Sequence, residues 1–349
     1  MILSVQYLRA VAALMVVWHH AREQLPGLKL FFPGEFGPSG VDLFFVISGF
    51  IMVATTAAKP GRPGQFLLRR FVRVVPLYWI LTGLLVALAW KAPQLFRSVD
   101  VTLGHVAASL LFIPHLSPTH PGMAWPILVP GWTLNFEMFF YAIFACTLFV
   151  QFRRRVWALA GVLVALVAVG VILGPFDSPV ASTYTSALLL EFLLGAGIAQ
   201  LWVGGHVIRP FGGALAAMVC GAVLLVWRDA PWPPLAQICG GGLLVAGALN
   251  PGLQRWRSRV LLPLGDASYS IYLSHLFSLG LLRWVWGRID ASVVGVAGAW
   301  AFMLAALLVG ALGGCLAFRV VEQPLLRWLY RMTRERPRVP AHDHGGAGA

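Results

Sequence analysis

The stretch VVGVAGAWAFMLAALLVGALGGCLAF, residues 293–318, contains no charged side chain. An α-helix needs roughly 20 consecutive apolar residues to cross the hydrocarbon core of a bilayer. Residues 293–318 exceed that length without interruption. This stretch therefore predicts a transmembrane helix, and the rest of the chain can be compared with it.

Nine further apolar stretches precede this one along the chain. They cover residues 3–23, 38–57, 71–91, 131–151, 156–174, 182–203, 210–227, 232–249 and 263–283. Of the 349 residues, 59% are hydrophobic and only 11% are charged, whereas about a quarter are charged in soluble domains. Such a composition excludes a disordered chain and a soluble enzyme with a wetted surface. We predict an all-α integral membrane protein, a polytopic bundle of about ten transmembrane helices.

The positive charges predict how this bundle is oriented. If the N-terminus is cytoplasmic and residues 101–116 do not span, 18 of the 26 Lys and Arg residues lie on the cytoplasmic side, seven lie outside, and Arg9 lies within the first helix. Cytoplasmic loops of membrane proteins carry such an excess. We therefore predict that both termini are cytoplasmic and that residues 92–130 form an outer loop with a short helix. Residues 1–330 then form a single transmembrane domain, and residues 331–349 a basic, disordered cytoplasmic tail.

This orientation also explains the net charge of +13, so we expect the lipid bilayer, and no nucleic acid, as a partner. The four cysteines have none of the spacings typical of metal sites.

Ionisable residues inside predicted spans are candidates for function, because placing them in lipid is costly. Arg9 and His20 lie within about 20° of one face of the first helix, while His19 points about 80° away. Arg9 and His20 can therefore line a channel together. Alternatively, each reaches the nearer membrane interface and has only a structural role.

Three other predicted helices carry polar groups. Asp42 lies near the outer end of the second helix, where an acidic residue can also simply meet the helix dipole. Glu137 lies about two turns below the outer surface and needs a polar partner there. His275 falls near mid-membrane, three residues after Tyr272, where a hydrogen bond to a neighbouring helix is the ordinary alternative.

The loop into the third helix carries an arginine cluster, Arg69, Arg70 and Arg73, just before Pro76. Guanidinium groups match phosphate oxygens, so a cluster beside a proline kink can bind phosphate. Anchoring to anionic lipid is the alternative. By the predicted topology, His20, Asp42 and Glu137 lie in the outer half of the membrane, and the arginines lie in the inner half with Glu322.

The order of these motifs resembles the acyltransferase 3 family of integral membrane O-acyltransferases. The opening Val5-Gln6-Tyr7-Leu8-Arg9-Ala10 looks most like its exopolysaccharide-modifying branch. Arg9 and His20 match the Arg-x10-His signature of that family, residues 40–50 its second motif, and Arg70 and Arg73 its Arg-x-x-Arg. Its later motifs are matched by residues 130–141, Ser268 to His275, and Glu322-Gln323-Pro324.

The resemblance implies transfer of an acyl group, acetyl in the first instance, from acetyl-CoA or another acyl-CoA to a sugar hydroxyl. His20 would be the base, oriented by Asp42 or Glu137. The donor would be bound by Arg9, Arg69, Arg70 and Arg73, and further candidates are Ser48, Tyr269, His275 and Glu322. We expect no permanently bound cofactor and no metal.

The resemblance also implies a location in a bacterial-type inner membrane. The partners it implies are a carbohydrate acceptor, free or lipid-linked, and the machinery of polysaccharide synthesis.

Two other functions fit the same residues. A transporter or flippase of a lipid-linked sugar would use the intramembrane His, Asp and Glu as a substrate or proton path. A non-catalytic membrane subunit of a polysaccharide synthase would not need His20 and Arg9 on one face.

Overall fold

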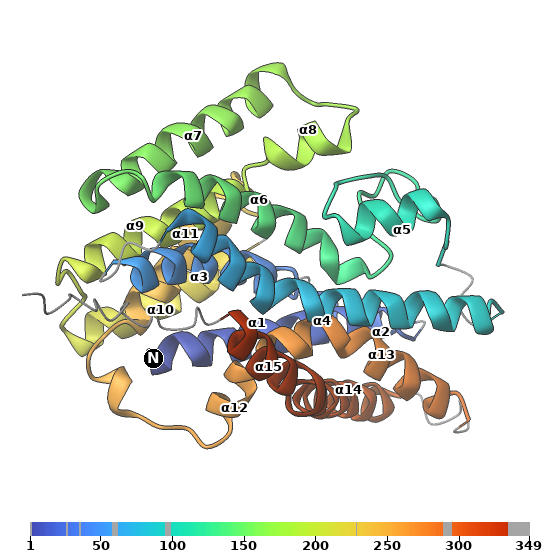
Figure 1. Cartoon of the computed structure of the whole chain (residues 1–349). Coiled ribbons are helices and arrows are strands. Elements are labelled where there is room, and N and C mark those ends of the chain that lie inside the picture. The colour runs from blue at the N-terminus through green and yellow to red at the C-terminus, as the bar shows by residue number, and fades with distance from the viewer. Residues whose placement is uncertain are drawn as a thin grey trace, which may run out of the picture.

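The computed structural model describes residues 2–25, 27–34, 36–57, 62–94, 99–227, 229–288 and 295–333. Within these ranges every regular element is a helix and no strand occurs (Figure 1). The prediction of an all-α chain is confirmed.

The helices follow one another in the following order. They are α1 (Leu3–Ala21), α2 (Leu28–Phe31), α3 (Ser39–Thr56), α4 (Pro63–Lys91), α5 (Leu103–Leu110), α6 (Trp132–Thr147), α7 (Phe152–Leu173), α8 (Pro179–Tyr184), α9 (Leu189–Val203), α10 (Phe211–Val226), α11 (Pro233–Ala248), α12 (Leu261–Asp266), α13 (Ser268–Trp286), α14 (Val296–Ala317) and α15 (Gln323–Thr333). The 3₁₀ turns Val129–Gly131 and Leu253–Arg255 precede α6 and α12, and the π-helix Phe318–Glu322 joins α14 to α15.

Five of the described helical segments are long and apolar enough to cross a membrane. They are Ser39–Thr56, Pro63–Lys91, Phe152–Leu173, Pro179–Val203 and Val296–Met332. The structure thus supports a membrane protein without confirming ten spans. The helices α6, α10 and α11 have only 16 residues each, and α1 and α13 are interrupted by ionisable residues such as Arg9 and His275.

The third predicted helix begins earlier than residue 71. Pro63 occupies the first turn of α4, a position that tolerates proline because its missing N–H would be unpaired there anyway. The prediction that Arg69, Arg70 and Arg73 lie in a loop is therefore wrong. They lie on the second and third turns of a helix that continues through Pro76.

The region 92–130 contains α5, which has eight residues. At 1.5 Å per residue it is about 12 Å long, far short of the roughly 30 Å of a bilayer core. The tyrosine hydroxyl of Tyr78 and the indole of Trp79 donate to backbone carbonyls of Ser109 and Leu110. These bonds hold α5 and its end against α4.

Helix α3 lies in the middle of the larger apolar core, against α9. A Cβ on Gly49 would lie 1.9 Å from the Phe192 carbonyl oxygen, and a Cβ on Gly195 would lie 1.9 Å from that of Val46. The two backbones can approach this closely only because both positions lack a side chain, as in other membrane helix pairs. This contact fixes the position of α3, which carries Asp42 and Ser48.

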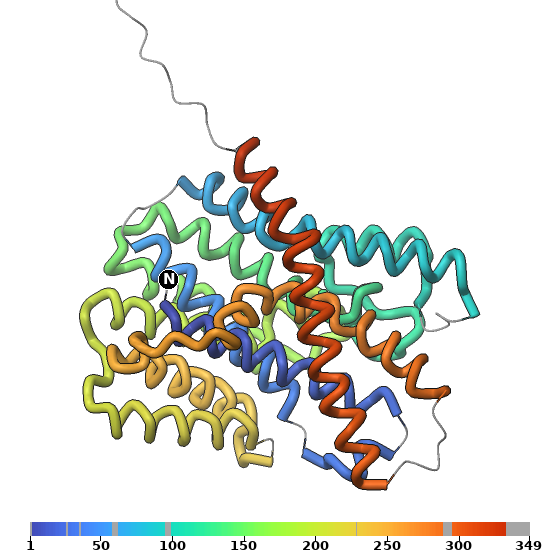
Figure 2. The backbone as a smooth tube through the Cα atoms, turned by 90° about the horizontal axis from the view of Figure 1, so that it is seen from below, coloured from blue at the N-terminus to red at the C-terminus, as the bar shows by residue number. Residues whose placement is uncertain are grey.

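A second, smaller core joins α1, α13 and α14 through residues such as Val17, Ile271 and Phe302. The helical segment Val296–Met332 follows as one long rod across a face of the molecule (Figure 2). The contact between α1 and α13 brings the rings of His20 and His275 together.

The predicted tail is largely outside the described residues, since 334–349 are not among them. Helix α15 reaches Thr333 and so enters the range 331–349. The division at residue 330 stays a prediction.

Candidate active site

A cavity lies between α1, α3, α4, α6 and α13. It is lined by Arg9, Val41, Phe44, Phe45, Ile47, Ser48, Ile51, Met52, Arg70, Arg73, Val74, Thr133, Leu134, Glu137, Tyr141, Ser268, Tyr269 and Tyr272. Three arginines and one glutamate thus face a space walled mainly by apolar and aromatic side chains. Such a cavity suits a ligand that has both an anionic and an apolar part.

A second cavity shares two of these arginines. Its lining consists of Gln6, Arg9, Arg73, Asp266, Phe318, Gln323, Leu326, Arg327 and Tyr330. Arg9 and Arg73 therefore stand where the two cavities adjoin, and Arg9 Nη1 donates to Gln6 Oε1 at 3.0 Å. An elongated anionic ligand can contact the same two guanidinium groups from both sides.

Arg73 is held by a buried carboxylate at the π-helix. It donates to Glu322, which is 1% exposed and also accepts a hydrogen bond from the Ser270 hydroxyl. The Arg73 guanidinium lies 5.7 Å from the centre of the Tyr269 ring, whose hydroxyl donates to the Val74 carbonyl at 2.6 Å. These contacts lock Arg73 in place across α4, α13 and the π-helix.

Arg70 and Arg69 differ in their surroundings. The Arg70 guanidinium lies 5.5 Å from the Phe66 ring centre, and its buried Nε has no hydrogen-bond partner in the described part of the chain. Arg70 lines the cavity and can donate to an anion there. Arg69 is exposed and does not line the cavity, so the structure separates it from the other donor-binding candidates.

Glu137 is the carboxylate of the cavity that Arg70 lines. One of its oxygens accepts hydrogen bonds from Ser48 at 3.2 Å and from Tyr141, which lies one turn further along α6. The polar partner that the sequence analysis expects for Glu137 is therefore present. Asp42, on α3, is 5% exposed and does not line this cavity.

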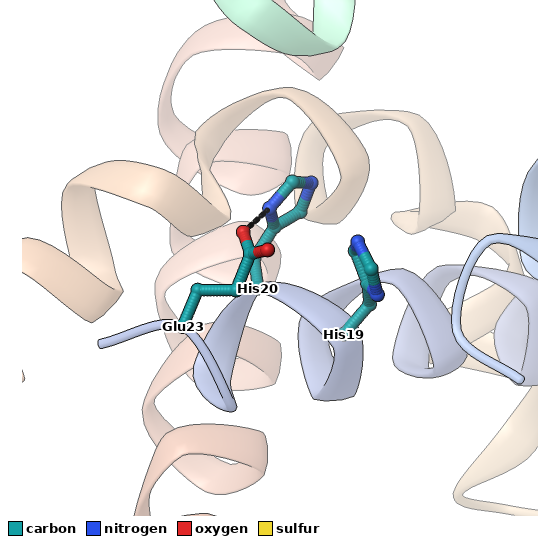
Figure 3. A group of neighbouring side chains, drawn as sticks. All are labelled: His19, His20 and Glu23. Carbon is teal, nitrogen blue, oxygen red and sulfur yellow. Dashed lines mark hydrogen bonds and ion pairs between the residues drawn. The ribbon is translucent and has the colours of Figure 1, made fainter. Parts of the chain in front are cut away.

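His20 lies near the end of α1, outside the cavity lining. Its Nδ1 is 3.4 Å from Glu23 Oε2 (Figure 3). The hydrogen bond with His20 lowers the pKa of Glu23, which lies in the turn beyond α1, to about 2. Glu23 is thus an ionised partner of His20 that the sequence analysis missed, although the i, i+3 spacing of the two residues indicated it.

His275 is the second ring against His20. The two imidazole centroids are 5.0 Å apart and their planes differ by 29°. His275 is fully buried, and its Nδ1 lies 2.7 Å from the Tyr272 carbonyl oxygen. The hydrogen must therefore be on Nδ1, which leaves Nε2 as an acceptor, and this atom has no partner among the described residues.

Aromatic rings separate His20 from the cavity. Phe44 and Tyr272 line the cavity, and their ring centres lie 5.7 Å apart. The ring centre of Tyr272 is 6.3 Å from that of His275, which in turn stacks on His20. The Tyr272 hydroxyl contacts Thr133 Oγ1 at 2.8 Å and donates to the Pro130 carbonyl at 2.9 Å. The arginines thus face one side of this aromatic row, and His20 lies at its other end.

These features define a class of protein: a helical membrane protein whose bundle encloses a basic cavity next to a histidine–carboxylate pair. Sequence comparison then gives the family. Residues 2–320 match the family model described as "Acyltransferase domain". The chain belongs to the acyltransferase 3 family, as its motifs predict, and is an O-acyltransferase.

Two relatives have names that bear on this assignment. The exopolysaccharide production protein ExoZ of Rhizobium meliloti (strain 1021) is 42% identical over 83% of this chain and 90% of its own length. The acyltransferase MdmB of Streptomyces mycarofaciens is 27% identical over 97% of this chain and 95% of its own length. No solved structure matches the chain.

Proposed function

We propose that this protein transfers an acyl group, acetyl in the first instance, from acyl-CoA to a sugar hydroxyl of an exopolysaccharide or another cell-surface glycan. The observation that carries the proposal is the gathering of Arg9, Arg70 and Arg73 on one cavity of the bundle. The identity to an exopolysaccharide production protein supports the carbohydrate acceptor.

In this proposal the arginines hold the donor. Coenzyme A carries three phosphate groups, and charge-assisted hydrogen bonds from guanidinium forks suit such groups. The apolar lining of the cavity suits the acyl-bearing arm, which extends along the aromatic row toward His20. Ser48, Glu137 and Tyr269 then shape the cavity around that arm.

His20 is the base in the transfer step. It accepts the proton of the sugar hydroxyl as the hydroxyl oxygen attacks the thioester carbonyl. The new C–O ester bond forms, the C–S bond breaks, and the CoA sulfur leaves as a thiolate that takes up a proton. Glu23 holds the Nδ1 hydrogen of His20, so the Nε2 lone pair is free to accept that proton.

The proposal includes an orientation with both termini in the cytoplasm of a bacterial-type inner membrane. The basic cavity would then receive acyl-CoA from the cytoplasmic side. His20 and Asp42 would face the outer half of the membrane, where a lipid-linked or polymer-bound sugar can be presented by the polysaccharide-synthesis machinery.

The test is release of free CoA thiol by the purified protein in liposomes supplied with acetyl-CoA and carbohydrate acceptor. Acyl transfer requires thiol release that depends on both substrates. A flippase of lipid-linked sugar, the alternative function, would release none. Mass spectrometry of the surface polysaccharide from cells with and without the protein then identifies the group by its missing mass.

A further inference from the structure

The end of α1 carries three metal-binding side chains at adjacent positions. His19, His20 and Glu23 each present a ligand atom, and the three atoms lie within 4.8 Å of one another (Figure 3). His19 and Glu23 are four residues apart, and His20 and Glu23 are three apart. Glu23 lies in the turn that follows α1, and this turn brings it beside the two histidines of the last helical turn.

The geometry is close to that of a transition-metal site. Two ligands at about 2.0–2.1 Å from a tetrahedral ion are about 3.4 Å from each other. His20 Nδ1 and Glu23 Oε2 are 3.4 Å apart, and the His19 and His20 ring centres are 5.0 Å apart. The three ligand atoms lie within 4.8 Å of one another, so they must draw closer to complete a three-ligand set, which leaves a fourth position for water.

The surroundings of the cluster orient these ligands. Lys29 Nζ lies 3.3 Å from Glu23 Oε1, so the other carboxylate oxygen is the one that faces the imidazoles. The Arg22 guanidinium points elsewhere, since it donates to the carbonyls of Gly34 and Pro33. A Cβ on Gly37 would lie 2.1 Å from the Cβ of His19, so the Gly37 backbone confines His19 from one side.

We propose that His19, His20 and Glu23 form a binding site for a divalent transition-metal ion, of which Zn²⁺ is the probe used here. Two imidazoles and one carboxylate suit Zn²⁺ and its neighbours in the first transition row, and do not suit Ca²⁺ or Mg²⁺. The cysteine spacings do not predict this site, because its ligands are two histidines and a glutamate at the end of α1.

The site has a consequence for catalysis that rests on the proposed function. A neutral imidazole has one lone pair. When His20 Nδ1 coordinates the metal, the ring hydrogen moves to Nε2, which can no longer accept a proton from the sugar hydroxyl. In the metal-bound site, Glu23 coordinates the ion and no longer accepts a hydrogen bond from His20. Zn²⁺ is therefore an inhibitor of acyl transfer that acts at the catalytic base.

Binding is tested on the purified full-length protein by isothermal titration with ZnCl₂ and by the visible spectrum of added Co²⁺. Because the chain also contains His342 and His344, all variants are made in a background in which both are alanine. We expect one Zn²⁺ per chain and tetrahedral Co²⁺ bands, with affinity reduced more than about tenfold in His19→Ala and Glu23→Gln. His206→Ala, which removes an exposed histidine elsewhere, should bind as the background does.

The binding result is independent of enzyme activity. Equal Zn²⁺ affinity in the background protein and in His19→Ala would overturn the site, and so would the absence of binding in the background. In the activity assay, micromolar Zn²⁺ should inhibit the background protein, His19→Ala should resist inhibition, and Mg²⁺ should have no effect. Zn²⁺ binding without any acyl transfer would refute the proposed function and leave the metal site standing.

Discussion

The imidazole rings of His20 and His275 stack on each other, 5.0 Å apart, although 255 residues separate them along the chain. His20 is near the surface and bonded to a carboxylate, whereas His275 is fully buried and bonded to a backbone carbonyl. One ring can therefore exchange protons with a substrate, while the other is fixed and supports it.

His20→Ala should abolish acyl transfer, and His19→Ala should retain most of it. Removal of a general base typically costs about 10²–10⁴-fold in rate. The measurement is acceptor-dependent release of CoA thiol, with acetyl-CoA binding as a control for folding. An active His20→Ala enzyme beside an inactive His19→Ala enzyme would show that the roles within the doublet are reversed.

Glu23→Gln should lower the rate of acyl transfer, because the carboxylate accepts the Nδ1 hydrogen of His20 and holds the ring in one orientation. The Glu23 carboxylate is ionised throughout the assay range, because its pKa is lowered to about 2. Glutamine has the same shape but no charge, so it holds the imidazole less firmly than the carboxylate does. A full rate of CoA thiol release in Glu23→Gln beside a reduced rate in Glu137→Gln would identify Glu137 as the partner instead.

The same low pKa bears on stability. A carboxyl group whose pKa is depressed in the folded state stabilises the fold above its ordinary pKa, and this stabilisation is lost as the pH falls toward about 2. Glu23 is partly exposed, so solvent screens this contribution. The pH dependence of activity between pH 5 and 8 should therefore reflect catalysis and not unfolding around Glu23.

Arg70→Ala should weaken acetyl-CoA binding by about ten- to a hundredfold, since a hydrogen bond to a charged group contributes about 1.5–3 kcal/mol. Arg70→Lys should restore binding only in part, because the planar fork is lost. The matched control is Arg69→Ala, which removes an arginine from the same turn that does not line the cavity. Equal titration curves for Arg69→Ala and Arg70→Ala would favour lipid anchoring for both arginines.

Glu322→Gln and Arg73→Met should each destabilise the protein, because breaking a buried ion pair costs about 3–5 kcal/mol. The double variant should lose less than the sum of the two, since neither charge is then left alone. Thermal unfolding in detergent measures the cycle. Strictly additive losses would mean that Arg73 and Glu322 do not act on each other in solution.

The sequence predicted those features of the fold and the site that depend on residues within a single helix. Apolar length predicts the helices, and the ordered motifs around Arg9, Asp42 and Glu137 indicate the family. The start of α4 was missed because three arginines suggest a loop, whereas Pro63 in the first turn allows the helix to begin before them. A cluster of arginines therefore does not by itself mark the end of a helix.

Contacts between helices could not be predicted in the same way. Nothing in the chain's periodicity brings His275 to His20, because that contact depends on how α13 packs on α1. Glu23 was overlooked because it is the last residue of the predicted span 3–23 and looks like an ordinary acid at the membrane surface. Its pairing with His20 depends on the turn that ends α1.

The π-helix Phe318–Glu322 links the rotation of α15 to Arg73, an arginine that lines the cavity and pairs with Glu322. A π turn holds one more residue than an α turn and is seldom favoured without outside support. If these five residues relaxed to α geometry, Glu322 would turn by about 100° around the helix axis, away from Arg73. The ion pair and the π turn therefore stabilise each other, and Glu322 fixes the rotation of α15 about its own axis. While Glu322 is paired with Arg73, α15 keeps one rotation about its axis. A ligand that draws Arg73 away from Glu322 would allow α15 to rotate.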